Sequence, residues 1–475
     1  MKDLTPAPDH VLVIGGGASG VLMTAHLLRQ AGAAVTLVEK GDLLGCGIAY
    51  STTDPDHLLN TRVHNMSAFP DQPHHFQDWL AARGQDPGPD GFVSRTTYGQ
   101  YMGDLLAPWK HDGRLTILRG EMVALDHDEG GVTGRLSDGR TVRADHAILA
   151  TGHAVPEPQP DLDSAWSFQG AVDPDSRVVI IGSGLSMVDQ TLSLLKAGHR
   201  GEIVSLSRHG LLPLAHGTVL PHPVPVQPVP GAEISALLHW GRSLAREAEA
   251  AGGSWRDAVD SIRPHVHRIW RDMSLPQRRR FMRHAGSWWG VHRHRIPPAS
   301  WDTLCDALTR GQLVIRRGTF ERAEGMKDHR LAHVRRPDGT RTTIAAARIV
   351  DCRGILRDLE AHGSPLIRDL LSRGTARMDP LRIGLDVALD ARLIDRTGTP
   401  VDRIRALGPV SRAAFWEITA IPDIREQAAR LATSPCRQEA DPVHLSVKPD
   451  GRSEGGPARH LQGSPRPSDP HPPPA

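Results

Sequence analysis

The feature that most constrains this chain is a glycine-rich turn between an apolar run and a helical pattern near the N-terminus. Residues Val11–Ile14 are apolar and lead directly into Gly15-Gly16-Gly17-Ala18-Ser19-Gly20. A helical pattern continues to Gln30, and a second apolar run, Val35–Val38, ends in Glu39. This order of strand, glycine turn, helix, strand and acid is typical of a dinucleotide-binding unit.

Each part of this stretch has a physical role in holding a dinucleotide. Gly15 makes the tight turn, Gly17 lets a pyrophosphate approach the backbone, and Gly20 lets the helix pack against the strand. Free N–H groups at the helix start favour the pyrophosphate, and Glu39 accepts from a ribose hydroxyl. We predict cofactor contacts at these four residues and at their neighbours Ser19 and Lys40.

The composition indicates a soluble protein of more than one domain. A chain of 475 residues is too long for one ordinary core, and its net charge of +2 argues against nucleic acid as a main partner. No stretch is long and apolar enough for a membrane span, and Met1–His10 lacks the pattern of a signal peptide. The four cysteines form no CxxC, zinc pattern or disulfide framework, which favours a cytoplasmic location.

A second copy of the opening device begins at Val178. The apolar run Val178–Ile181 leads into Gly182-Ser183-Gly184, a helix is predicted to Leu195, and the strand Ile203–Leu206 ends in Ser207-Arg208. An arginine at the position of the acid can pair with a 2′-phosphate, so this site favours NADPH, although an arginine can also stack on adenine. We predict nicotinamide nucleotide contacts at Gly182, Gly184, Ser186 and Arg208.

The repeat extends beyond the two glycine turns. Strands are predicted at Leu115–Leu118 and in a meander over Met122–Leu125, Thr133–Leu136 and Thr141–Ala144, with Asp138-Gly139 as a hairpin turn. Ala147–Ala150 then leads into Thr151-Gly152, where the backbone can pass close to a bulky group, so we predict cofactor contacts at Thr151 and Gly152. Leu313–Arg317, a meander turning at Asp338-Gly339, and Arg348–Val350 leading into Asp351–Gly354 repeat this order, which predicts two dinucleotide-binding domains.

We therefore predict an α/β protein of two Rossmann-like domains, the NAD(P)H domain inserted in the FAD domain. The predicted parts are the FAD domain at 1–153, the NAD(P)H domain at 175–355 with a helical insertion at 210–308, and an FAD-domain return segment at 356–434. The return segment should contain strands Ile383–Leu389 and Ile404–Ala406 and a helix from Pro422 to about Ala432. The Pro-rich tail 435–475 has few apolar residues and is predicted to be disordered.

The insertion opens with a Pro-rich loop, Pro221–Pro230, and contains a basic, aromatic region that allows three interpretations. This region includes Arg278–Arg280 and Trp288–Arg295. Cations interleaved with rings can bind nucleic acid, but the near-neutral overall charge argues against that. The arginines can simply face water, or His292–Arg295 can reach an anionic cofactor phosphate or substrate.

Two dinucleotide sites in one chain imply electron transfer between their ligands. The expected pair is a resident FAD in the first site and NADH or NADPH as co-substrate in the second. A flavin disulfide reductase needs a redox cysteine pair, whereas Cys46 has no second cysteine before Cys305. Oxygen is the remaining common acceptor, and a C4a-hydroperoxyflavin can hydroxylate an electron-rich carbon or an amine.

No acid–base dyad or metal cluster stands out, so the catalytic predictions rest on single residues. His64, His292 and His294 are candidates for a general base or a substrate anchor, although most of the 26 histidines are expected to be structural or exposed. The helix that begins at Pro422 can aim its positive end at the flavin edge where negative charge gathers on reduction.

Several stretches together resemble the bacterial FAD/NAD(P)-binding family that includes FAD-dependent urate hydroxylases and aspartate N-monooxygenases. The resemblance covers Val11 to Ala432 and implies FAD contacts at the first glycine turn, Glu39 and the Asn60 region, with Gly408 in the return segment. One departure is Asp351-Cys352-Arg353-Gly354, where related proteins tend to carry an Asn-Cys-Thr-Gly turn. The stretches are Gly15–Gly20, Gly45–Ser51 with Leu58–Asn60, Ala150–Gly152, Gly182–Gly184, Ser207–Gly210, Val291–Arg295, Gly408-Pro409 and Trp416–Gln427.

The resemblance leaves the substrate open. Urate is planar and anionic, so Arg293 or Arg295 with a stacking Trp416 would suit it, and the compact length favours hydroxylation of urate to 5-hydroxyisourate. Aspartate would need two cationic anchors and a free amine, which also fits. A flavoprotein reductase or redox-sensing module without oxygenation is the alternative from another class. We predict as catalytic residues Asn60, His64, Arg293, Arg295 and Trp416.

Overall fold

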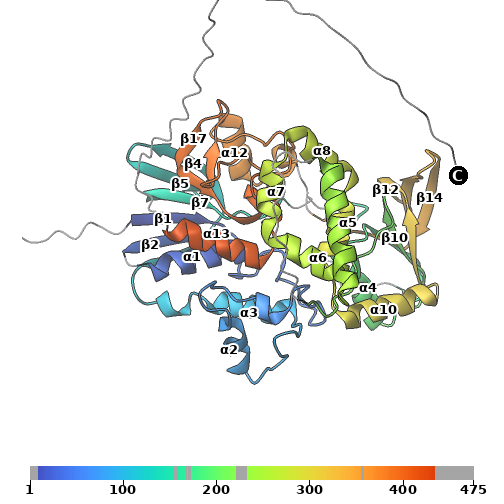
Figure 1. Ribbon diagram of the computed structural model, residues 1–475. Coiled ribbons are helices and arrows are strands. Elements are labelled where there is room, and N and C mark those ends of the chain that lie inside the picture. Colours follow the sequence, from blue (N-terminus) through green and yellow to red (C-terminus); the bar gives the residue numbers. More distant parts are fainter. Residues whose placement is uncertain are drawn as a thin grey trace, which may run out of the picture. The chain divides into compact units, whose positions relative to one another are not determined.

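The computed structural model contains two parallel sheets, each flanked by helices and a small antiparallel meander (Figure 1). It describes residues 9–30, 32–154, 159–166, 168, 173–220, 233–354 and 358–433. The first sheet has the order β16-β17-β7-β1-β2-β3, in which β16 alone runs antiparallel to its neighbour. Its strands are β1 (Asp9–Ile14), β2 (Ala33–Glu39), β3 (Leu115–Arg119), β7 (His146–Leu149), β16 (Arg392–Ile394) and β17 (Pro400–Ala406).

The continuous apolar run of β1 has a direct structural cause. Val11 and Val13 face a core formed with α1 (Ala18–Arg29) and α13 (Ile421–Thr433), which lie side by side in Figure 1. Leu12 and Ile14 face the opposite core, under the first meander and α12 (Pro365–Arg373). Both faces of the strand are therefore buried, as is usual in a parallel sheet with helices on its faces.

The second sheet repeats this plan with the order β11-β10-β9-β15-β8, all parallel. Val178 and Ile180 face a core with α4 (Leu185–Lys196) and α10 (Pro298–Thr309), while Val179 and Ile181 face the second meander. The segment between the first two predicted domain parts contributes the short strand β8 to this sheet. The strands are β8 (Asp163–Ser164), β9 (Val178–Ile181), β10 (Ile203–Ser207), β11 (Leu313–Arg317) and β15 (Arg348–Asp351).

The two meanders confirm the predicted duplication. Their hairpin turns contain Gly139 with a φ of +89° and Gly339 with a φ of +86°, as the Asp-Gly pairs predict. The first consists of β4 (Met122–Asp128), β5 (Gly131–Leu136) and β6 (Thr141–Ala144). The second consists of β12 (Thr319–Gly325), β13 (Arg330–Arg335) and β14 (Arg341–Ala346).

The segment between β10 and β11 is helical, as expected. It packs its own small core around Trp270, which also receives Ala413 and Trp416 from the return segment. The helices are α5 (Ile234–Ala250), α6 (Trp255–Ile262), α7 (Val266–Asp272), α8 (Leu275–His284), α9 (Gly286–Arg293) and α10. The predicted loop Pro221–Pro230 and the tail 435–475 lie outside the described residues, and the exact domain limits stay predictions.

The return segment differs from its prediction in one element. Ile404–Ala406 lies in β17, and α13 begins at Ile421, one residue before the predicted Pro422. Ile383–Leu389, however, is not a strand and makes only the isolated bridges of Leu385 and Val387. Its alternate residues are buried like those of a strand, but Arg382 and Ala391 at its flanks have φ values of 54° and 68°, which a regular strand does not allow.

Three further helices complete the described fold. Phe76 and Leu80 are fully buried in α2 (His75–Ala81), so this short helix packs its apolar face into the core. The other two are α3 (Arg95–Asp104) and α11 (Leu359–His362), neither of which is predicted from the sequence. None of the helices in the described ranges has the length and apolarity that crossing a membrane requires.

Candidate active site

The backbone of the first glycine turn is packed too closely at two of its glycines to accept a side chain. Gly15 has a φ of +103°, and a Cβ there would lie 2.5 Å from the carbonyl oxygen of Ala150. A Cβ on Gly20 would lie 1.8 Å from the carbonyl oxygen of Gly15. Gly17 precedes α1, and no side chain caps this helix end. The backbone N–H groups of its first turn are thus available to an anion.

The second turn has the same construction. Gly182 has a φ of +116°, and its Cβ would lie 2.4 Å from the carbonyl oxygen of Cys352. The N–H of Gly182 donates to Leu206 O at 2.8 Å, as that of Gly15 donates to Val38 O at 2.8 Å. Gly184 precedes α4, which again has no side-chain cap. Both turns fit a dinucleotide pyrophosphate by the same backbone geometry.

The two turns differ in what covers them. The N–H of Gly45 donates to Gly16 O at 2.8 Å, and a Cβ on Gly17 would lie 3.3 Å from the Cα of Gly47. The loop after β2 therefore lies directly on the first turn. A Cβ on Gly184 would meet no atom within 4 Å in the described part of the chain. The described residues therefore leave the second turn less covered than the first.

The charged residues at the strand ends lie where the motif predicts. Glu39 accepts hydrogen bonds from the N–H groups of Gly16 and Gly41, and its carboxylate retains acceptor positions for ribose hydroxyls. Lys40 instead forms an exposed ion pair with Glu121 at 3.1 Å. Arg208 is exposed at the end of β10. Their assignments as cofactor contacts stay predictions.

The remaining predicted cofactor residues gather at two places. Thr151 and Gly152 follow β7, where Gly152 has a φ of +69°. A Cβ on Gly408 would lie 2.6 Å from Ser19 Oγ, so the return segment closes onto the first turn of α1. Ser186 lines a cavity of about 600 Å³ between α4 and the Ile48–His57 loop.

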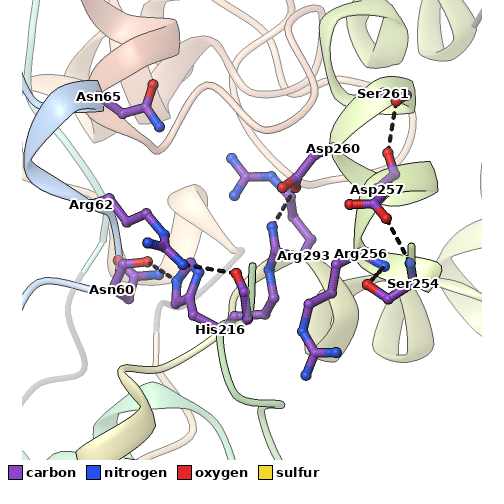
Figure 2. Close-up of polar contacts among 12 residues, drawn as sticks. Asn60, Arg62, Asn65, His216, Ser254, Arg256, Asp257, Asp260, Ser261 and Arg293 are labelled. Atoms are coloured by element: carbon purple, nitrogen blue, oxygen red, sulfur yellow. Dashed lines mark hydrogen bonds and ion pairs between the residues drawn. The ribbon is translucent and has the colours of Figure 1, made fainter. Parts of the chain in front are cut away.

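A buried cluster of charges joins the helical insertion to the return segment. The Nε of Arg293 donates to Glu417 Oε2 at 3.1 Å, and Trp289 donates to the other carboxylate oxygen. Arg295 is only 4% exposed and donates to Asp260 of α6, which turns towards the arginines in Figure 2. The structure thus places Arg293 and Arg295, both predicted from the sequence as catalytic residues, in one buried cluster of charges.

These arginines keep unused hydrogen-bond donors. The second terminal nitrogen of Arg293 and the Nε and first terminal nitrogen of Arg295 are buried, with no hydrogen-bond partner among the described residues. Buried guanidinium groups of this kind normally bind an acid, a ligand or water. The unused nitrogen of Arg293 lies 4.0 Å from Asp423, so the free donors of Arg295 are the candidate position for an anionic group.

Glu417 is held in an unusual backbone conformation. Its φ is +70°, a region that costs a non-glycine residue of the order of 1–2 kcal/mol. Its side chain is held between Trp289 and Arg293, and Asp423 in the first turn of α13 lies 4.0 Å from Arg293. Asp260, Glu417 and Asp423 were not predicted as site residues. Glu417 and Asp423 lie in the Trp416–Gln427 stretch that carries the family resemblance, but no local pattern connects them or Asp260 to the two arginines.

His216 connects the Asn60 region to this cluster, because it contacts Asn60 and is close enough to Arg295 to be affected by its charge; Figure 2 draws both groups. The backbone oxygen of Asn60 accepts from His216 Nε2 at 3.0 Å, and Arg62 donates to Gly217 O at 2.8 Å. Burial, and then the charges of Arg295 and other arginines, lowers the pKa of His216 to about 4, against the hydrogen bond to Asn60 that raises it. His216 is therefore neutral at physiological pH.

Two predicted catalytic residues lie apart from these donors. His64 is exposed, and its ring nitrogens contact Pro89 O at 2.9 Å and the Asn65 amide at 2.8 Å. Trp416 stacks on Trp270 with ring centroids 4.5 Å apart and has Arg412 over its ring. Trp416 is a packing residue of the insertion core, and the predicted roles of both residues in catalysis stay untested.

Comparisons with known proteins agree with this geometry. Residues 12–154 match a family model described as FAD-NAD(P)-binding, so FAD and NAD(P) are the cofactors of this domain type. A comparison with curated proteins gives no match.

Solved structures of similar fold include ornithine hydroxylase from Pseudomonas aeruginosa (14% identity, TM-score 0.61, covering 90% of this chain and 98% of that one). They also include the Kutzneria sp. 744 ornithine N-hydroxylase with reduced FAD, NADP+ and L-ornithine (14% identity, TM-score 0.62, 90% and 99%). A third is L-lysine 6-monooxygenase from Pseudomonas syringae (16% identity, TM-score 0.60, 89% and 97%). At these identities the likeness shows the fold alone.

The assignment of FAD to the first turn and of the nicotinamide nucleotide to the second predicts a different loss in each of two variants. Gly17→Val would place a side chain against Gly47 and the pyrophosphate path, so the purified protein should lose its flavin absorbance. Gly184→Val should retain the flavin but lose its anaerobic reduction by NAD(P)H. A Gly17→Val protein that stayed yellow would refute the first assignment, and a Gly184→Val protein reduced by NAD(P)H like the wild type would refute the second.

Burial of His294 predicts an acid-sensitive stability. Burial, and then Arg293, lowers its pKa from 6.5 to about 4. The unfolded chain therefore takes up this proton first as the pH falls, and the native state should lose about 2 kcal/mol between pH 7 and pH 5 from this residue alone. Urea unfolding of His294→Gln should show a correspondingly shallower pH dependence, whereas a matched change at the exposed His284 should leave the slope unaltered.

Proposed function

We propose that the chain is an FAD-dependent monooxygenase that uses NAD(P)H and O2 to N-hydroxylate a small amine that also carries a carboxylate. The observation that carries this proposal is the set of buried, unused donors on Arg293 and Arg295 beside the Asn60 region. The likeness to ornithine and lysine hydroxylases supports the N-hydroxylating reaction. The reaction is RNH2 + O2 + NAD(P)H + H+ giving RNHOH, water and NAD(P)+.

Two sets of residues, each a glycine turn with the charged residue at the end of the next strand, would hold the cofactors. Gly15, Gly17, Gly20 and Glu39 would hold FAD, and Gly182, Gly184, Ser186 and Arg208 the nicotinamide nucleotide. The bound flavin supplies the oxygen-activating chemistry. The loop over the first turn keeps its nucleotide in place, and the open second turn allows the reductant to exchange.

The protein's own residues would then orient the substrate. Arg295 donates two unused N–H groups to the carboxylate, while Asp260 fixes its guanidinium. Glu417 orients Arg293 in the same way. These ion pairs leave the arginines preorganised, so little side-chain entropy is lost when an anion binds.

The surplus of cations around this place also favours the reactive form of an amine. Arg256 donates to Ala215 O, and Arg425 to Ser67 O at 2.8 Å, so neither charge is matched by an acid in those contacts. A positive surrounding lowers the pKa of a nearby ammonium group. Only the unprotonated amine has the lone pair that attacks oxygen, so this environment promotes N-hydroxylation.

Urate hydroxylation is the second candidate, because the same arginines would suit the urate anion. The stacking residue expected for urate is less favourable, since the ring of Trp416 is already occupied by Trp270 and Arg412. We therefore rank an amino-acid amine first and urate second.

A substrate panel tests the reaction. Aspartate, ornithine, lysine and urate should be compared by coupled NAD(P)H and O2 consumption with detection of hydroxylamine product. One amino acid should stimulate oxidation and yield an N-hydroxy product. Consumption of urate would support the second candidate, and peroxide alone with every compound would favour a reductase without oxygenation.

A substitution of Arg295 tests the carboxylate anchor. Arg295→Met should raise the KM for the substrate by about 10–100-fold, as expected from losing charge-assisted hydrogen bonds, with a smaller effect on NAD(P)H. Exposed Arg283→Met on α8 is the matched control and should behave like the wild type. Retained flavin content and melting temperature would separate lost binding from misfolding, and an unchanged KM in a folded Arg295→Met protein would reject this role.

A further inference from the structure

Two unpaired arginines lie at the edge of the second sheet where a nucleotide's adenosine would lie. In a dinucleotide-binding unit, the ribose 2′ position meets the end of the second strand. That strand is β10, which ends at Ser207 and is followed by Arg208. Its parallel neighbour β11 ends at Arg317, in register with Ser207. The two parallel strands therefore each place an arginine at the same edge of the sheet, Arg208 directly after β10 and Arg317 at the end of β11.

The loop that carries Arg208 is fixed by the second glycine turn. Ser183 Oγ, within that turn, lies 2.9 Å from Ser207 Oγ and 2.6 Å from Leu211 O. Ser207 Oγ also accepts from the N–H of Gly210 at 3.0 Å. The pyrophosphate turn and the Ser207–Leu211 loop are thus one hydrogen-bonded unit, which sets the position of Arg208 relative to a bound nucleotide.

The same loop packs on the side chain of Arg317. Gly210 has a φ of +64°, and a Cβ there would lie 2.9 Å from Arg317 Cγ. Glycine lets the backbone cross the aliphatic part of Arg317 without a clash. The Arg317 side chain is consequently held beside the loop that presents Arg208.

The other arginines near this edge are already neutralised. Arg316 lies 3.4 Å from Glu202, and Arg353 lies 2.6 Å from Asp351. The side chains of Arg208 and Arg317 are both exposed and make no hydrogen bond or ion pair with any residue that the structure describes. Two neighbouring like charges held without a counter-ion favour an anion between them.

We propose that Arg208 and Arg317 together bind the 2′-phosphate of NADPH, and that Arg317 is the residue by which this unit selects NADPH over NADH. The inference rests on the proposed function only for the assignment of the nicotinamide nucleotide to the second site. A phosphate monoester carries up to two negative charges at neutral pH, which two guanidinium groups match and one does not.

Nucleotide binding to the FAD-loaded full chain tests this assignment without any hydroxylation. Titration calorimetry should compare adenosine 2′,5′-bisphosphate with adenosine 5′-monophosphate. The wild type should prefer the bisphosphate by about 100-fold, and Arg317→Ala and Arg208→Ala should each remove about tenfold of that preference. Arg317→Lys should be intermediate, because it keeps the charge but loses the planar fork.

Arg316→Ala is the matched control, since it lies on the same strand but pairs with Glu202, and it should keep the full preference. Anaerobic flavin reduction should show the same order as a ratio of NADPH to NADH rates. A preference left intact in folded Arg317→Ala, or no preference in the wild type, would overturn the proposal.

The two proposals fail separately. A protein that prefers the bisphosphate through Arg317, yet hydroxylates no amine, would refute the proposed function alone. An enzyme that hydroxylates an amine with NADH and NADPH equally would refute the arginine pair alone.

Discussion

Both nucleotide turns depend on one backbone contact. In each unit, the first glycine of the turn touches the carbonyl oxygen of the residue that follows a neighbouring strand, Ala150 for Gly15 and Cys352 for Gly182. A Cβ at either glycine would overlap that oxygen, so this contact, and not the ligand, first requires glycine there. The strand after each meander thereby fixes the position of its nucleotide turn, and the chain between them can vary freely.

A second constraint connects the parts that the duplication leaves unrelated. The helical insertion and the return segment are joined by the ion pair of Arg293 with Glu417 and by the packing of Trp270 on Trp416. A buried ion pair contributes little net stability over apolar packing, but breaking one partner is costly. This arrangement suits a binding site better than a core, because the charges are held in place while some of their donors remain free.

How much of this could be read from the sequence depends on how local each signal is. The glycine turns, the Asp-Gly hairpins and the apolar strands are recognised within about ten residues, and each was predicted. The partners of Arg293 and Arg295 are not local: Asp260 comes from α6 and Glu417 from the return segment. The alternation over Ile383–Leu389 was misleading, because burial of alternate residues does not require a neighbouring strand. The packing of Trp416 likewise depends on Trp270, which no periodicity connects to it.

The two copies share the geometry of the glycine turn and differ in the loops that surround it. Identical turn geometry cannot by itself make one nucleotide resident and the other exchangeable, because the backbone contacts to the pyrophosphate are the same. The difference must come from the loops that cover each turn.

In the first copy the loop after β2 returns to the turn through Gly45 and Gly47, two glycines that allow the backbone of the loop to lie on the backbone of the turn. In the second copy the loop after β10 is hydrogen-bonded beside the turn through Ser183 and Ser207, and none of the described residues covers Gly184. If the turns hold FAD and a nicotinamide nucleotide as proposed, exchange at the second site would require no movement of the described loops, whereas release from the first would require the covering loop to move.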